Sequence, residues 1–138
     1  MNKELGVSYG KIRRFFQTTF GIVLSRGGAC QSLLKAASRA EGAYRQIASD
    51  VRRSRKLTPD ETGWKVGGVL WWMWDFVTPR AVFYRIAPSR GFDVIEGVLG
   101  ADWAGRTTHD GWSPYDRLEQ ATHQQCLGHF LVRCKNLL

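Results

Sequence analysis

The run of apolar and aromatic residues from Val69 to Val77 restricts the fold of this chain more than any other segment. Its tryptophans and branched residues are typical of a strand that is covered on both faces. The turn residues 78–80 follow, and Ala81–Ile86 is again apolar, so the sequence predicts a β-hairpin. Val66–Val77 is too short for a membrane span, which needs about 20 apolar residues.

The rest of residues 57–138 alternates between strand and helix patterns. Residues 57–62 predict a strand that Gly63 interrupts, and residues 88–91 open a helix that Gly100 closes. Further strands are expected at residues 105–109 and 122–126, and a last helix at residues 128–138. This order predicts an α/β fold with a mixed sheet.

Two acidic motifs stand at the ends of predicted strands: Asp60-Glu-Thr-Gly-Trp64 and Asp110-Gly-Trp-Ser-Pro-Tyr-Asp116. If those strands are neighbours, Asp60 and Asp110 lie side by side. Paired carboxylates are ligands for hard divalent cations such as Mg²⁺, which activate a water or hydroxyl for displacement at phosphorus. From the residues alone, the alternative is that both aspartates are turn-forming acids.

The net charge of +8 is unevenly distributed along the chain. Residues 1–59 hold twelve Lys and Arg against three acids, whereas the remainder is close to neutral. This distribution indicates a basic arm, residues 1–56, that binds a polyanion such as DNA, attached to a separate core, residues 57–138.

The arm is predicted to be helical. Ser8 can cap a first helix that Gly21 ends, and a second, longer helix starts near Arg26 with one apolar stripe. Two helices joined by a short turn fit either a helix-turn-helix or a helical hairpin that packs on the core. The candidate DNA-binding residues are Arg13 and Arg14 on the first helix.

A denser basic cluster, Arg52, Arg53, Arg55 and Lys56, lies just before the first acidic motif. Cations at a helix C-terminus are favourable with the helix dipole in any protein. Because this cluster precedes Asp60 by only a few residues, we predict that it contacts DNA phosphates.

Five motifs together resemble the transposases of insertion-sequence family 66, in the same order and spacing. They are Asp60–Trp64, the aromatic hairpin, Pro88-Ser-Arg-Gly91, Asp110–Asp116 and His123-Gln-Gln-Cys-Leu-Gly-His129. The resemblance implies an incomplete ribonuclease H-like mixed sheet preceded by a helix-turn-helix-like arm. It also implies a DDE arrangement of acids that binds Mg²⁺ or Mn²⁺ for DNA cleavage and strand transfer. Asp60 and Asp110 would then be the first and second catalytic, metal-binding acids.

Three features depart from that family pattern. No acid follows Glu119, so we expect a C-terminally truncated transposase that lacks the third carboxylate, is inactive alone and holds metal weakly. Pro59 removes a ladder hydrogen bond from what should be a central strand, and residues 106–109 are polar where a buried strand normally carries aliphatics. The alternative function is a non-catalytic DNA-binding or interaction module that acts with intact transposase or with itself at insertion-sequence ends.

The C-terminal motif offers one further cluster, His123, Cys126 and His129. It is spaced like a zinc site, but structural zinc sites usually have two pairs of close ligands, so a purely structural role is the other interpretation. The three cysteines are odd in number and sparse, which argues against a disulfide framework. With no signal peptide at the N-terminus, the sequence predicts a cytoplasmic protein.

Overall fold

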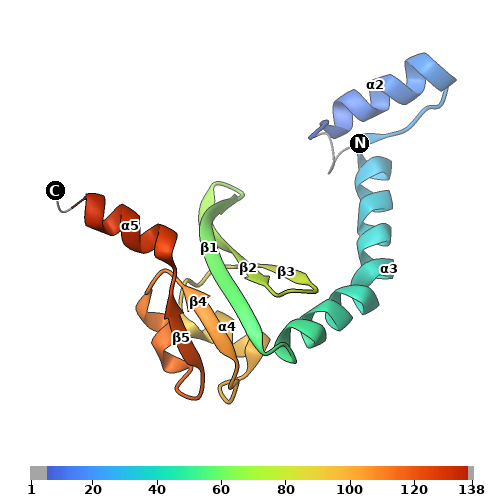
Figure 1. The fold of residues 1–138 in the computed structure, drawn as a ribbon. Coiled ribbons are helices and arrows are strands. Elements are labelled where there is room, and N and C mark those ends of the chain that lie inside the picture. The colour runs from blue at the N-terminus through green and yellow to red at the C-terminus, as the bar shows by residue number, and fades with distance from the viewer. Residues whose placement is uncertain (1–5, 137–138) are drawn as a thin grey trace. The chain divides into compact units, whose positions relative to one another are not determined.

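A computed structural model describes residues 6–136 of the chain (Figure 1). Contacts divide the protein into two compact units, Met1–Ala43 and Tyr44–Leu138, and the division falls inside one long helix. None of the helices within residues 6–136 combines the length and the hydropathy that a bilayer span requires. The predicted final helix extended to Leu138, and its last two residues lie outside the described part of the chain.

The N-terminal unit contains the two helices that the sequence predicts. Helix α2, Tyr9–Phe20, is capped by Ser8, whose hydroxyl accepts a hydrogen bond from the main-chain nitrogen of Lys11 at 3.3 Å. It ends at Gly21, which adopts a left-handed conformation with φ 66°. Helix α3, Arg26–Arg52, follows.

Only the last turns of α3 belong to the C-terminal unit. There Val51 is fully buried and Ala48 packs against the core, while Tyr44 donates its hydroxyl to the carbonyl of Tyr84 at 2.8 Å. The predicted apolar stripe is therefore buried mainly at its C-terminal end.

A five-stranded sheet forms the centre of the C-terminal unit (Figure 1). Its strands are β1 Lys56–Val66, β2 Val69–Val77, β3 Val82–Ala87, β4 Arg106–His109 and β5 Thr122–Gln125, in the order β3-β2-β1-β4-β5. The β1–β2 and β2–β3 pairs are antiparallel, and β4 is parallel to both β1 and β5. The predicted mixed α/β sheet and the hairpin are confirmed.

Two details of the predicted strands are wrong. Gly63 does not end the first strand, because β1 continues to Val66 and Gly63 pairs with Trp72 of β2. Strand β2 is not covered on both faces. Trp74 and Phe76 are fully buried, whereas Val77 on the other face is 37% exposed. The tryptophans of the sheet also differ in exposure: Trp74 is buried, whereas Trp64 at the far end of β1 is 44% exposed.

We call the buried side of the sheet the core face. Helix α4, Phe92–Leu99, and the end of α3 cover it, and it carries residues from every strand: Leu57, Pro59 and Glu61 of β1, Trp74 and Phe76 of β2, Phe83 of β3, Thr107 and His109 of β4, and His123 of β5. Side chains alternate along a strand, so the opposite face carries Lys56, Thr58 and Asp60 of β1, Asp75 of β2, and Arg106 and Thr108 of β4. After β4 come the short helix η1, Ser113–Arg117, and later α5, Leu127–Lys135.

Candidate functional site

The parallel pairing of β1 with β4 brings Asp60 and Asp110 to the same end of the sheet. Lys56 pairs with Arg106 and Leu57 with Thr107. If this register is continued by three residues, Asp60 is aligned with Asp110. Each aspartate follows Lys56 or Arg106 by four residues, so its side chain projects from the same face of the sheet as those cations. The two aspartates that the sequence predicts as catalytic thus lie in line across adjacent strands, Asp60 within β1 and Asp110 directly after β4. Their catalytic and metal-binding roles stay predictions.

Each of these aspartates has one oxygen held by the main chain. Oδ1 of Asp60 accepts a hydrogen bond from the nitrogen of Glu61 at 2.9 Å, and Oδ1 of Asp110 accepts one from the nitrogen of Trp112 at 2.8 Å. The second bond closes a turn over Gly111, whose φ of 86° favours glycine. Within residues 6–136, neither Oδ2 has a hydrogen-bond or ion-pair partner, so each carboxylate keeps an oxygen for a ligand.

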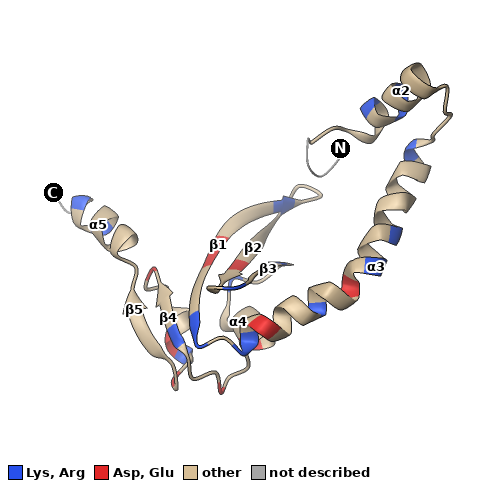
Figure 2. Cartoon of the chain, turned by 45° about the vertical axis from the view of Figure 1, so that its right-hand side comes forward, with Lys and Arg blue, Asp and Glu red and all other residues tan. Residues whose placement is uncertain are grey.

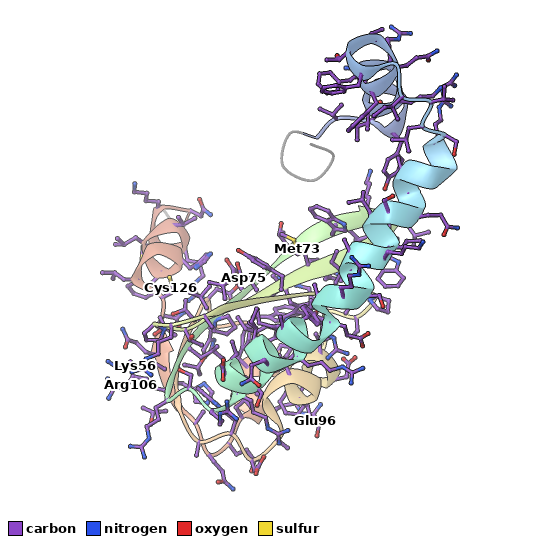
Figure 3. The ribbon with its side chains drawn as sticks, turned by 90° about the vertical axis from the view of Figure 1, so that its right-hand side faces the viewer. Lys56, Met73, Asp75, Glu96, Arg106 and Cys126 are labelled. Carbon is purple, nitrogen blue, oxygen red and sulfur yellow. The ribbon has the colours of Figure 1, made fainter. Side chains whose placement is uncertain are left out.

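A third carboxylate on the opposite face, Asp75, was missed in the sequence analysis. It pairs across the hairpin with Asp60, and its Oδ1 is buried with no hydrogen-bond partner among the described residues (Figure 3). Burial raises the pKa of Asp75, and the negative charge of Asp60 raises it further. The signal was present in the sequence, because Asp75 is the charged residue within an otherwise apolar strand.

The donor atoms fit a hard divalent cation, although the set is small. Carboxylate oxygens are the ligands that Mg²⁺ and Mn²⁺ prefer, and the partnerless buried oxygen of Asp75 adds negative charge beside Asp60. In the described part of the chain, no three acidic, histidine or cysteine groups that include Asp60 or Asp110 come within 4.8 Å of one another. Asp60 and Asp110 stay the predicted ligands of such an ion.

Directly behind Asp60, on the core face, Glu61 is the centre of a buried polar network. Its side chain is 1% exposed. One carboxylate oxygen accepts a hydrogen bond from Nε of Arg90 at 3.0 Å and forms an ion pair with Nη2 of Arg90 at 2.9 Å. The other oxygen accepts a hydrogen bond from the hydroxyl of Tyr115 at 2.7 Å. Burial raises the pKa of Glu61, while the bonds from Tyr115 and Arg90 lower it. Glu61 is thus a buried residue on the face of β1 away from Asp60.

Arg90 extends this network to the loop that follows Asp110. Its guanidinium lies over the ring of Trp72 at 4.6 Å and over the ring of Trp112 at 4.2 Å. The indole nitrogen of Trp112 donates to the carbonyl of Arg90 at 3.4 Å. Because Glu61 adjoins Asp60 and Trp112 lies two residues after Asp110, the network connects the backbones that carry both aspartates.

A chain of hydrogen bonds through two histidines accounts for the polar character of β4. The nitrogen of Gly111 donates to Nδ1 of His109 at 3.1 Å, so the neutral His109 ring carries its proton on Nε2. That Nε2 lies 3.0 Å from Nδ1 of His123, and Nε2 of His123 lies 3.1 Å from the carbonyl of Leu118. Burial lowers the pKa of His109, as does the neighbouring His123. His109 is therefore hydrogen-bonded in its neutral form.

The described residues contain one group of potential metal ligands whose ligand atoms lie within 4.8 Å of one another: His109, Asp116 and His123. A metal on Nε2 of His109 would require the proton to move to Nδ1, where it would meet the N–H of Gly111. The hydrogen-bond chain therefore favours a structural role for these histidines over a metal site.

The predicted cluster of His123, Cys126 and His129 is divided between two environments. His123 belongs to the chain with His109, whereas Cys126 is the N-cap residue of α5 and pairs with His129. The main-chain N–H of His129 and its imidazole lower the pKa of the Cys126 thiol, and the thiol in turn raises the pKa of His129. Within residues 6–136 the three side chains do not meet as one set of ligands.

The predicted DNA-binding residues lie in two places. Arg13 and Arg14 are exposed on α2, in the N-terminal unit. Arg52 and Arg53 end α3 and pair with Asp102 and Asp50, whereas Arg55 and Lys56 precede or begin β1. Along β1 the acidic residues Asp60 and Glu61 lie between the basic residues Lys56 and Lys65, a few positions from each (Figure 2). Lys56 lies four residues before Asp60, a distance of about 13 Å along a strand.

A comparison with protein families matches residues 4–136 to the Transposase IS66 family. The chain belongs to this family. A comparison with curated proteins gave no match.

One solved structure with a similar chain is the "CryoEM structure of simian T-cell lymphotropic virus intasome in complex with PP2A regulatory subunit B56 gamma". The identity is 14% and the TM-score 0.44, a similarity too low to bear on the fold. The alignment covers 60% of this chain and 37% of that chain, so this chain spans well under half of that protein's length.

The five motifs that resemble the IS66 family each supply residues to the region around the two aspartates. The first motif supplies Asp60 and Glu61, the hairpin supplies Trp72, and the third supplies Arg90. The fourth supplies Asp110, Trp112 and Tyr115, and the fifth supplies His123. Glu61, Trp72, Arg90, Trp112 and Tyr115 belong to one network beside the paired aspartates. His123 is linked to Tyr115 through His109, so the five motifs converge on a single region of the sheet.

Proposed function

We propose that this IS66-family protein takes part in DNA cleavage and strand transfer at the ends of an insertion sequence, in the cytoplasm. In this proposal Asp60 and Asp110 hold a divalent cation, Mg²⁺ or Mn²⁺. DDE transposases generally use divalent metals. The observation that carries the proposal is the parallel register of β1 and β4, which aligns the two aspartates and leaves one oxygen of each unpaired.

The mechanism assigns separate tasks to the residues of the site. When bound, a divalent cation activates the attacking water or hydroxyl and stabilises the leaving oxygen. Asp60 and Asp110 present their free Oδ2 atoms to it, and the main-chain bonds to Oδ1 fix the carboxylate orientations. Glu61, Arg90 and Tyr115 are positioning residues, because they hold the two backbones together from the core face. Preorganised ligands lower the cost of arranging the reacting groups.

Divalent-metal-dependent nicking of a DNA duplex with insertion-sequence terminal repeats tests this function. We expect Asp60→Asn and Asp110→Asn each to abolish nicking and to leave DNA affinity measured in EDTA unchanged. Asp102→Asn is the matched control, because the side chain of Asp102 is 83% exposed and lies outside the site. Nicking that survives in both site variants would refute the roles of the two aspartates.

A second candidate is a non-catalytic DNA-binding or interaction module that acts with intact transposase or with another copy of this chain. It is favoured by the small ligand set, since two carboxylates hold Mg²⁺ more weakly than three. This candidate predicts DNA binding without nicking in the unaltered protein. If adding intact IS66 transposase restores nicking and the Asp60→Asn variant does not reduce it, the module is the correct assignment.

A further inference from the structure

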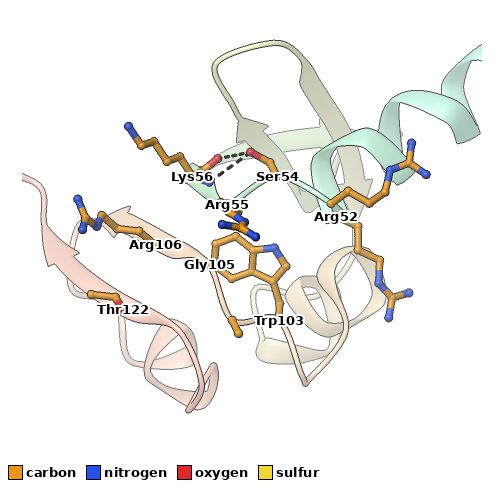
Figure 4. A pocket seen from close by; sticks show the side chains of 10 residues that line it. Arg52, Ser54, Arg55, Lys56, Trp103, Gly105, Arg106 and Thr122 are labelled. Carbon is orange, nitrogen blue, oxygen red and sulfur yellow. Dashed lines mark hydrogen bonds between the residues drawn. The ribbon is translucent and has the colours of Figure 1, made fainter.

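Three cations that no acid neutralises lie together at the start of β1. Lys56 pairs with Arg106 across the parallel β1–β4 ladder, and the nitrogen of Arg106 donates to the carbonyl of Arg55 at 2.9 Å. Lys56 and Arg106 extend on the same side in Figures 3 and 4. In the described part of the chain, Arg55, Lys56 and Arg106 make no ion pair. Like charges on directly opposed residues are destabilising, so this arrangement favours a bound polyanion.

The same residues line a cavity of about 620 Å³ (Figure 4). Trp103, which is 6% exposed, forms one of its walls, and Gly105 allows the indole to pack there. An added Cβ at Gly105 would lie 2.3 Å from the Trp103 ring. The Trp103 wall of the cavity is therefore a packed part of the fold, and the exposed cations lie at its edge.

A groove leads from these cations toward the aspartates. Lys56, Thr58 and Asp60 alternate along β1, and Arg106 and Thr108 alternate along β4 toward Asp110, so all project from the opposite face. A second cavity of about 390 Å³ includes Thr58, Thr108 and Gln124 in its lining. Next to the cations, and beside the apolar Val77 and Pro79, this cavity is thus lined by hydroxyl and amide groups. These are the groups that contact nucleic-acid backbones without reading sequence.

We propose that this groove is a binding track for the DNA strand that flanks the reacting phosphate. Lys56 and Arg106, with Arg55 beside them, bind backbone phosphates about 13 Å from the paired aspartates, which corresponds to roughly four base pairs. Thr58, Thr108 and Gln124 contact the strand in between. The inference rests on the proposed function for its partner, DNA, and it adds Arg106 and a defined path to the predicted contact between the basic cluster and DNA phosphates.

A salt titration of DNA binding in EDTA tests the phosphate contacts without any cleavage. Each phosphate contact contributes about 0.9 to the slope of log K against log salt, so Arg106→Gln lowers the slope by about 0.9 and Lys56→Gln/Arg106→Gln by about 1.8. Lys65→Gln is the control, because it removes the same charge from the far end of β1. Arg106→Lys should retain the slope, and thermal unfolding verifies that the variants fold.

Thiol labelling tests the path of the strand. In a protein whose three cysteines are changed to Ser, we introduce Thr108→Cys in the groove or Lys65→Cys outside it. DNA should slow maleimide labelling at position 108 at least fivefold, and Lys56→Gln/Arg106→Gln should remove the protection. Equal slopes for Arg106→Gln and Lys65→Gln, or no protection at position 108, would overturn the track. The proposed function is tested separately: Asp60→Asn should lose nicking, while the slope of log K against log salt for DNA binding stays unchanged.

Discussion

The buried ion pair between Glu61 and Arg90 gives the sharpest stability prediction, for Arg90→Met. The variant keeps an unbranched side chain between Trp72 and Trp112 and removes the partner of a carboxylate that is 1% exposed. An unpaired buried carboxylate becomes neutral, since the folded protein disfavours its charge. The loss of stability is then limited by the free energy needed to protonate Glu61.

The size of this loss follows from the pKa values. Protonating a carboxyl with an ordinary pKa of about 4.3 at pH 7 costs about 3.7 kcal/mol, the upper limit of the effect. Burial already raises the pKa of Glu61 in the intact network, so we expect roughly 2 to 3 kcal/mol, below the usual range for breaking a buried pair.

The pH dependence has a definite sign. A carboxyl with a raised pKa in the folded state contributes stability that is present below its unfolded pKa and is lost as the pH rises through the folded pKa. The deficit of Arg90→Met therefore shrinks by up to about 1.4 kcal/mol for each unit that the pH is lowered from 7 toward 5.

Urea unfolding in EDTA at pH 7 and pH 5.5, followed by circular dichroism, measures the deficit. Arg117→Met is the matched control, because Arg117 lies over the Phe92 ring at 4.3 Å and should cost no more than about 1 kcal/mol. The double variant Glu61→Gln/Arg90→Met should recover more than half of the loss, since no charge is left buried. A deficit that is the same at both pH values, or additive single effects, would refute the reasoning.

Three further predictions concern other contacts. Tyr115→Phe removes a hydrogen bond to a charged acceptor and should cost about 1.5 to 3 kcal/mol in the same unfolding assay; a cost below that of an average surface substitution would contradict it. Gly105→Ala forces its Cβ into Trp103 and should cost about 1 to 3 kcal/mol, whereas Gly42→Ala, with no atom within 4 Å, should be neutral or stabilising. Because hydrogen bonds from His129 lower the pKa of Cys126, its alkylation should reach half-maximal rate at a lower pH than that of a free cysteine, whose pKa is about 8.5, and His129→Ala should move that midpoint upward.

The site shows which kinds of inference a single sequence permits. Asp60 and Asp110 were found because each ends a strand-like segment within a motif, and the hairpin was found because its apolar run has no helical period. Asp75 and Arg106 were missed, since each is an isolated charge whose relevance depends on a partner in another strand. The role of His123 was also missed, because its partner His109 belongs to a different segment.

Local sequence determined the elements of this protein: the capped helix after Ser8, the β2–β3 hairpin, and the helix that ends at Gly100. These features depend on contacts between residues that are close in the chain, so their patterns are visible in the sequence. Tertiary structure decided the rest. The register of β1 on β4 fixes that Lys56 meets Arg106 and Asp60 meets Asp110, and a shift of one residue would turn all of these side chains to the other face. Register depends on packing across the whole sheet, which a strand pattern does not contain.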